Sequence, residues 1–261
     1  MIAPVVQAAP AGAVLADVRW YADGRPVSDA YEQGHLPGAV LVDLESALAG
    51  AATPEGGRHP LPSPEEFAAA MAGLGIGDDD LVVAYDDEGG VLAARLVWML
   101  RVTGHEAALL DGPGPLTSTG TATRAPAVFT PRPWPAERLA TAQDALDPGS
   151  VVLDARAGER YRGEVEPLDP RAGHVPGARS LPCRELVEDG RLLPVEQLRA
   201  RFAAVGVEAG SDVVAYCGSG VTACHDLLAM EHAGLGTGRL YPGSWSAYSA
   251  DPDAPVATGA D

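Results

Sequence analysis

The sequence contains no lysine, and all eighteen of its basic residues are arginine. It has only three cysteines, too few for a disulfide framework, so we expect a reducing, cytoplasmic compartment. No apolar run reaches the roughly 18 residues of a membrane span. The first residues also lack the basic start and long apolar core of a secretory signal. We therefore expect neither a membrane anchor nor secretion.

Positive charge is scarce overall, since 36 acidic residues give the chain a formal net charge of −18. Such a chain does not suit nucleic acid or an anionic membrane as a partner, because both require a basic face. The acidic surface also provides no long-range attraction for a small anion. An anionic substrate must therefore be held locally, by arginine, backbone N–H groups or hydroxyls.

Of the 261 residues, 46% are hydrophobic, which is enough for a packed core. The chain also contains an internal repeat. The motif Gly-His-x-Pro-Gly-Ala begins at Gly34 and again at Gly173, 139 positions later. The apolar stretch before Asp86 has a counterpart before Cys217, but here the separation is 131 positions. The loop that follows the motif therefore differs by eight residues between the two copies.

Each copy alternates short apolar strands with helical patterns, which indicates α/β units with a parallel sheet. Helices are predicted at residues 64–73 and 91–103 in the first copy, and at 194–205 and 222–233 in the second. A stretch rich in Thr, Ser, Gly and Pro between the copies indicates a linker. We predict a first domain over 1–115, a linker over 116–145 and a second domain over 146–261. Each domain is expected to be a mainly parallel sheet flanked by helices.

The strongest candidate for chemistry is Cys217, which follows an apolar strand and opens the loop Cys-Gly-Ser-Gly-Val-Thr. Gly218 and Gly220 permit a tight loop whose backbone N–H groups converge on the sulfur. Thr222 then begins a helix, whose dipole adds to the positive field. These features favour a thiolate that attacks soft electrophiles and can carry an extra sulfur atom as a persulfide.

The alternative is that Cys217 is an inert buried cysteine, as most free cysteines are. The first copy argues against this, since the same turn there carries Asp86 and needs no sulfur. Cys183 and Cys224 are interpreted as packing residues, although Cys224 could also serve as a resolving thiol. They form no metal-binding cluster, so neither a metal nor another cofactor is expected.

Several segments together carry a family resemblance. The doubled Gly-His-x-Pro-Gly-Ala motif, the Tyr31 that precedes its first copy, and the segments Arg58-His59-Pro60-Leu61-Pro62 and Tyr241-Pro242-Gly243-Ser244-Trp245 resemble the tandem-domain rhodaneses, a family of sulfurtransferases. The resemblance covers essentially the whole chain. It implies an inactive first domain and a second domain in which Cys217 cycles between thiol and persulfide. His35 and His174 occur in both copies, including the one without a cysteine, and are interpreted as structural.

Within the family, the loop resembles that of members that use 3-mercaptopyruvate. Gly218 and Ser219 are neutral, whereas thiosulfate-using members tend to have basic residues there. The resemblance implies that Ser219 assists proton transfer or polarises the substrate carbonyl. Gly218, Gly220, Val221 and Thr222 complete the active-site loop.

The resemblance also implies two arginines after Asp154 that bind the substrate carboxylate. Arg160 matches the first of them. The expected spacing of the second falls on Asp169, and Arg171 follows two positions later. Arg160 and Arg171 are therefore the candidates for substrate binding.

We expect a sulfurtransferase that moves sulfane sulfur from 3-mercaptopyruvate, through a Cys217 persulfide, to a thiol, thioredoxin or cyanide. Thiosulfate as the donor, or a persulfide carrier that serves a partner protein, stays open as an alternative. A protein phosphatase is not expected, because phosphatases of related fold clamp phosphate with an arginine in this loop. Here the corresponding position is Thr222.

Overall fold

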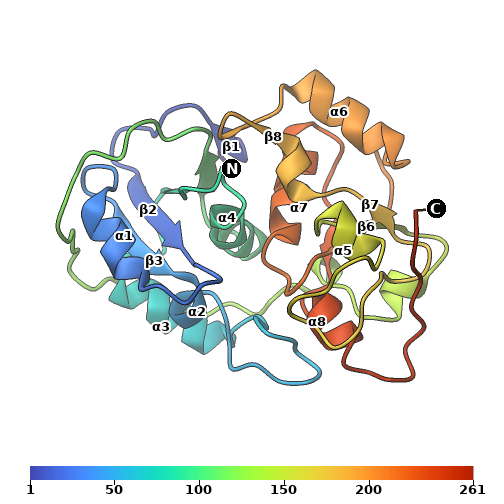
Figure 1. Ribbon diagram of the computed structural model, residues 1–261. Helices are drawn as coiled ribbons and strands as arrows, with labels where there is room; N and C mark the ends of the chain where they lie inside the picture. The colour runs from blue at the N-terminus through green and yellow to red at the C-terminus, as the bar shows by residue number, and fades with distance from the viewer. Residues whose placement is uncertain (261) are drawn as a thin grey trace. The chain divides into compact units, whose positions relative to one another are not determined.

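The computed structural model describes residues 1–260, which form two compact units (Figure 1). The first unit comprises Met1–Gly50, Pro62–Trp134 and Asp189–Arg191. The second comprises Ala51–Leu61, Pro135–Glu188 and the described residues from Leu192 onward. The segment Ala51–Leu61, hereafter segment 51–61, thus belongs to the first half of the sequence but packs in the second unit.

The first unit contains a parallel sheet of five strands in the order β1-β5-β4-β2-β3. Helix α4 is buried on most of its surface and packs against β4 and β5. The strands are β1 Val5–Val6, β2 Val14–Arg19, β3 Val40–Asp43, β4 Val82–Tyr85 and β5 Ala107–Leu110. The helices are α1 Val27–Gln33, α2 Leu44–Ala47, α3 Pro64–Gly73 and α4 Ala93–Val102.

The second unit contains a parallel sheet of four strands in the order β11-β10-β6-β7. Helix α7 packs against β10, α6 and the short 3₁₀ helix η3. The strands are β6 Val151–Asp154, β7 Arg179–Ser180, β10 Val213–Tyr216 and β11 Arg239–Leu240. A separate ladder pairs β8 Val187–Glu188 with β9 Arg191–Leu192. The helices are α5 Gly158–Tyr161, α6 Val195–Ala204, α7 Ala223–His232 and α8 Ser244–Tyr248, with 3₁₀ turns η1 Ala136–Arg138, η2 Asp144–Leu146 and η3 Cys183–Leu186.

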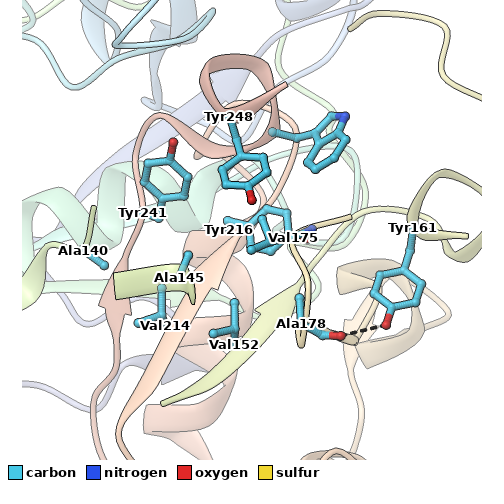
Figure 2. Close-up of a cluster of buried hydrophobic side chains, with 11 residues drawn as sticks. Ala140, Ala145, Val152, Tyr161, Val175, Ala178, Val214, Tyr216, Tyr241 and Tyr248 are labelled. Atoms are coloured by element: carbon cyan, nitrogen blue, oxygen red, sulfur yellow. Dashed lines mark hydrogen bonds between the residues drawn. The ribbon is translucent and has the colours of Figure 1, made fainter. Parts of the chain in front are cut away.

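The core of the second unit explains why its strands are apolar without interruption. Val152 of β6 and Val214 of β10 are buried together with the aromatic rings of Tyr216, Tyr241 and Tyr248 (Figure 2). A parallel sheet covered on both faces leaves no solvent-facing side, so its strands need apolar residues at successive positions. The predicted α/β fold class, with two domains built on mainly parallel sheets, is confirmed.

Local signals determine where the helices begin. Helix α3 starts at Pro64, because Ser63 accepts a hydrogen bond from the backbone of Glu66 and Glu66 in turn accepts one from the backbone of Ser63. The structure confirms the prediction of a helix over 64–73 residue for residue. The other three predicted helices form as α4, α6 and α7, each shorter by one or two residues per end.

The repeated histidines have the same structural task in both units. His35 stacks on Tyr31 with ring centroids 4.0 Å apart, and His174 stacks on Tyr161 at 3.7 Å. In each pair, the histidine Nδ1 lies 2.8 to 2.9 Å from the tyrosine's own carbonyl oxygen. Both histidines are buried, in agreement with their interpretation as structural residues.

Candidate active site

The loop from Cys217 to Thr222 connects β10 to α7, at the carboxyl edge of the sheet, where ligands bind in open α/β folds. Gly220 has a φ of +76°, and a Cβ placed on it would lie 2.6 Å from the Pro242 carbonyl oxygen. This position therefore requires glycine. Cys217 itself is buried, with 2% of its surface exposed.

Helix α8 holds this loop in place through its first residues. The Trp245 N–H donates to the Cys217 carbonyl at 2.9 Å, and the Ser246 N–H donates to the Gly218 carbonyl at 2.8 Å. The Cys217 N–H donates to Oγ of Ser244 at 3.1 Å. Ser244 occupies the left-handed region at φ +51°, which is uncommon for a residue other than glycine. The loop is thus fixed by its neighbours as well as by its own sequence.

The first copy shows what such a loop binds. The Asp86 carboxylate accepts hydrogen bonds from four backbone N–H groups at 2.7 to 2.8 Å, those of Glu88, Gly90, Leu92 and Ala93. Burial raises the pKa of Asp86, and these four donors oppose the shift. The turn is therefore an anion cradle, and in the first unit the side chain of Asp86 fills it.

The two loops are 131 positions apart, so the corresponding donors in the second copy are the N–H groups of Ser219, Val221, Ala223 and Cys224. The Cys224 N–H bonds to the Val221 carbonyl at 3.1 Å. For the other three N–H groups, residues 1–260 provide no hydrogen-bond acceptor. The second cradle therefore has donors to offer an anion next to Cys217.

A histidine from segment 51–61 completes the arrangement around Ser219. Nδ1 of His59 lies 2.8 Å from Oγ of Ser219, and both residues are buried. The Arg58 N–H donates to Oγ of Ser246 at 3.1 Å, which ties segment 51–61 to α8. Gly57, at φ +78°, permits this approach, because a Cβ there would lie 2.6 Å from the Gly243 carbonyl oxygen.

Two guanidinium groups lie beside the loop at Gly218. A Cβ placed on Gly218 would be 3.1 Å from Nη2 of Arg58 and 3.5 Å from Nη1 of Arg160. Arg58 forms an ion pair with Asp169, and Arg160 contacts the same carboxylate at 3.1 Å and Glu166 at 2.6 Å. The side chain of Arg160, a residue predicted from the sequence, is 17% exposed.

The structure gives Arg171, the second predicted arginine, a different set of partners. Its guanidinium donates to the backbone carbonyls of Tyr248, Ser249, Asp251 and Ala254. Its own carbonyl accepts from the Trp245 indole at 2.9 Å. Arg171 therefore fastens the end of the chain to α8, while Arg58 provides the second guanidinium at the loop.

The other two cysteines lie behind the loop. Sγ of Cys224 donates to the Gly220 carbonyl at 3.4 Å, inside the buried first turn of α7. Burial raises the pKa of the Cys183 thiol, which also contacts the Thr222 side chain. Among residues 1–260, no three His, Cys, Asp or Glu side chains gather as a metal site, and no helix is long and apolar enough to cross a membrane.

Arg58 and His59 are not among the site residues predicted from the sequence, yet the sequence contains a signal for them. The first copy has 16 residues between α2 and α3, whereas the second has eight between η3 and α6. The extra eight residues fall where segment 51–61 leaves the first unit. An insertion found in one copy only, and carrying a histidine, is the feature that points to a role outside that copy.

The comparison with known proteins identifies the class. The sequence pattern of the rhodanese-like domain matches the chain twice, over residues 6–112 and 137–251. The chain belongs to the rhodanese-like family, and with two such domains and relatives named as sulfurtransferases it is a sulfurtransferase.

The relatives narrow the class further. The chain is 45% identical over 245 residues to the "Probable 3-mercaptopyruvate sulfurtransferase" of Pseudomonas aeruginosa, which covers 88% of this chain and 86% of that protein. It is 30% identical to "Thiosulfate/3-mercaptopyruvate sulfurtransferase 1, mitochondrial" of Arabidopsis thaliana, over 93% of this chain and 73% of that one. The crystal structure of SseA from Escherichia coli, described as a 3-mercaptopyruvate sulfotransferase, superimposes with a TM-score of 0.78 at 34% identity, over 90% of this chain and 94% of that one.

Proposed function

We propose that this protein is a 3-mercaptopyruvate sulfurtransferase in which Cys217 receives the sulfur. The observation that carries the proposal is the 2.8 Å contact between His59 Nδ1 and Ser219 Oγ. Breaking the carbon–sulfur bond of 3-mercaptopyruvate leaves an enolate that must gain a proton, whereas thiosulfate releases sulfite without proton transfer. A hydroxyl paired with an imidazole next to the nucleophile supplies acid–base chemistry that only the first donor needs.

The transfer step balances without an external redox partner. The Cys217 thiolate attacks the donor's sulfur, so that a sulfur–sulfur bond forms as the carbon–sulfur bond breaks and its electron pair stays on carbon. The proton of the donor thiol passes through Ser219 and His59 to that carbon. The products are pyruvate and the Cys217 persulfide anion, with the sulfur oxidised to the sulfane level and the carbon reduced.

The donor's carboxylate is bound by Arg58 and Arg160. Both guanidinium groups reach the loop at Gly218, where no side chain blocks them. Asp169 and Glu166 hold the two side chains in this position before the donor arrives. Because the loop itself carries no charge, this pair provides the local attraction that an acidic protein needs for an anionic substrate.

The cradle stabilises the persulfide. Its outer sulfur accepts hydrogen bonds from the N–H groups of Ser219, Val221 and Ala223, as the Asp86 carboxylate does in the first unit. A thiolate, including that of thioredoxin, or cyanide then attacks the outer sulfur. The sulfur–sulfur bond breaks and the Cys217 thiolate is regenerated.

Thiosulfate is the second candidate donor. The two guanidinium groups at Gly218 suit a dianion, and the Arabidopsis relative is named for both donors. A third candidate is a carrier that passes its persulfide to a partner protein with little turnover of free donors. All three share the Cys217 cradle and differ in whether Ser219 and His59 are needed.

Two measurements test the proposal. Intact mass after incubation with 3-mercaptopyruvate should rise by one sulfur atom, and Cys217→Ser should abolish both this gain and pyruvate release. Ser219→Ala and His59→Gln should each lower kcat with 3-mercaptopyruvate by about 10²-fold or more, and turnover with thiosulfate far less. Ser28→Ala, at an exposed serine of α1, is the control. Pyruvate release by Cys217→Ser, or equal losses with both donors, would overturn the mechanism.

We also infer a cytoplasmic location. All three cysteines are unpaired, and the proposed cycle needs a free thiol and a reducing acceptor. Fractionation of cells that produce the protein tests this, since recovery outside the cytoplasm would contradict it.

A further inference from the structure

A cavity lies in the second unit. Its volume is about 620 Å³, which is within the range of small-molecule sites. It is bounded by residues 142–146 before β6, by Tyr241 and Tyr248, and by residues 250–255 near the end of the chain. Pro54 and Glu55 of segment 51–61 complete the wall, whereas no residue from Cys217 to Thr222 lines it.

The charge of this cavity has one sign. Glu55, Asp251 and Asp253 line it, and no arginine or histidine does. Within residues 1–260, none of these three carboxylates has an ion-pair partner, and the one side-chain contact is from the Asp253 N–H to Oδ1 of Asp251. A ligand that enters therefore meets the carboxylates of three exposed residues that form no ion pair in the described chain.

Arg171 explains how the wall keeps this charge. This arginine contacts the chain that carries Asp251 and Asp253, but it donates to the backbone carbonyls of Tyr248, Ser249, Asp251 and Ala254 and to no carboxylate. The Tyr248 hydroxyl adds a bond to the Pro255 carbonyl at 2.6 Å. Hydrogen bonds to backbone carbonyls thus hold this part of the wall, and the carboxylates of Asp251 and Asp253 are left to contact a ligand.

The tyrosines give the cavity a neutral hydroxyl group and aromatic ring faces. Tyr241 is 7% exposed, and burial raises the pKa of its hydroxyl to about 12, so the group stays neutral. Its hydroxyl has no hydrogen-bond partner within residues 1–260. Figure 2 shows the Tyr241 and Tyr248 rings at the edge of the core cluster, with the Tyr241 hydroxyl directed away from it. Tyrosine rings attract cations through their faces.

We propose that this cavity binds an organic cation, an ammonium group carried on a small apolar body. The ammonium lies among the carboxylates of Glu55, Asp251 and Asp253 and donates to the free hydroxyl of Tyr241. The apolar body packs on the tyrosine rings and on Leu146. The site is separate from the sulfur-transfer site and does not depend on the proposed function.

Calorimetric titration of the whole protein at low salt, with phenethylammonium as the probe, tests the proposal. Phenethyl alcohol, which has the same body without the charge, should bind at least about fivefold more weakly. Binding should also weaken as salt is added, because Glu55, Asp251 and Asp253 are all exposed and their charges are screened. Equal binding of the alcohol and the ammonium ion would overturn the proposal.

Variants locate the site. The double variant Asp251→Asn/Asp253→Asn should weaken phenethylammonium binding by about tenfold, and Tyr241→Phe by about threefold. Glu137→Gln, at an exposed acid outside the cavity, should leave binding unchanged. The unfolding temperature of each variant reports whether it is folded. If the folded double variant binds the probe as the natural chain does, the cation does not bind in this cavity.

Discussion

Gly218 has no side chain at the point where two guanidinium groups meet the loop. Its φ is not positive, so the backbone accepts alanine, but the new Cβ would lie 3.1 Å from Nη2 of Arg58. The methyl group should push the Arg58 guanidinium out of the position in which we propose that it binds the donor's carboxylate. Gly218→Ala should therefore raise KM for 3-mercaptopyruvate severalfold and change kcat less, as measured by steady-state pyruvate release. Gly73→Ala, where a Cβ meets nothing within 4 Å, is the control. An unchanged KM would show that Arg58 does not bind the donor's carboxylate.

Asp226 has a fully buried carboxyl group, one turn into α7. Neither of its oxygens has a hydrogen-bond partner within residues 1–260. Burial, together with the charges of Cys217 and Asp154, raises its pKa well above the ordinary value. The folded protein therefore keeps a proton that the unfolded chain releases above pH about 4. The free energy of unfolding therefore falls as the pH rises above about 4, by up to about 1.4 kcal/mol per pH unit, until the folded protein also loses the proton.

Asp226→Asn removes this titration and should flatten the pH dependence. The difference in free energy of unfolding, variant minus natural protein, should increase between pH about 5 and about 8 in urea denaturation. The same substitution at the exposed Asp79 is the control. Parallel curves for the natural protein and Asp226→Asn would show that the buried carboxyl does not hold its proton.

At the scale of elements, the strand–loop–helix turn occurs twice with two different occupants. In the first unit the Asp86 carboxylate accepts from four N–H groups, whereas an asparagine offers only one acceptor oxygen. Asp86→Asn should lower the free energy of unfolding by about 2–4 kcal/mol, because two buried donors lose their acceptor. Sulfur transfer should continue in the folded variant, since Asp86 lies in the other unit. Denaturation and the pyruvate assay, run together, separate the two effects; a folded but inactive variant would contradict this account.

The elements themselves were largely predictable from the sequence. Proline at the start of α3 and the apolar strand before Cys217 are local signals, and each recurs in the other copy. Segment 51–61 has no such local signal, because its turn and irregular backbone have no periodicity; only its presence as an insertion in one copy sets it apart. The second guanidinium at the loop was not predicted, for a related reason. The expected spacing falls on Asp169, with Arg171 two positions later, whereas Arg58 reaches Gly218 through space from a distant segment.

At the scale of the whole molecule, the net charge of −18 opposes the approach of every anionic donor. Salt screens this long-range repulsion more strongly than it screens the short-range attraction between the donor and the half-buried guanidinium groups at the loop. The value of kcat/KM for 3-mercaptopyruvate should therefore rise by about twofold between ionic strengths of about 10 and about 150 mM. Stopped-flow measurement of persulfide formation checks this, and a decrease with salt would mean that local attraction dominates the encounter.

Segment 51–61 also bears on how such a protein can evolve. A duplicated domain that has lost its nucleophile is ordinarily free to drift or to be deleted. Here the half without the cysteine supplies Arg58 and His59 to the site of the other half. A descendant that kept only the second half of the gene would inherit Cys217 without the two residues proposed to bind the donor and to move its proton. On this proposal, deletion of residues 51–61 should abolish sulfur transfer although Cys217 remains.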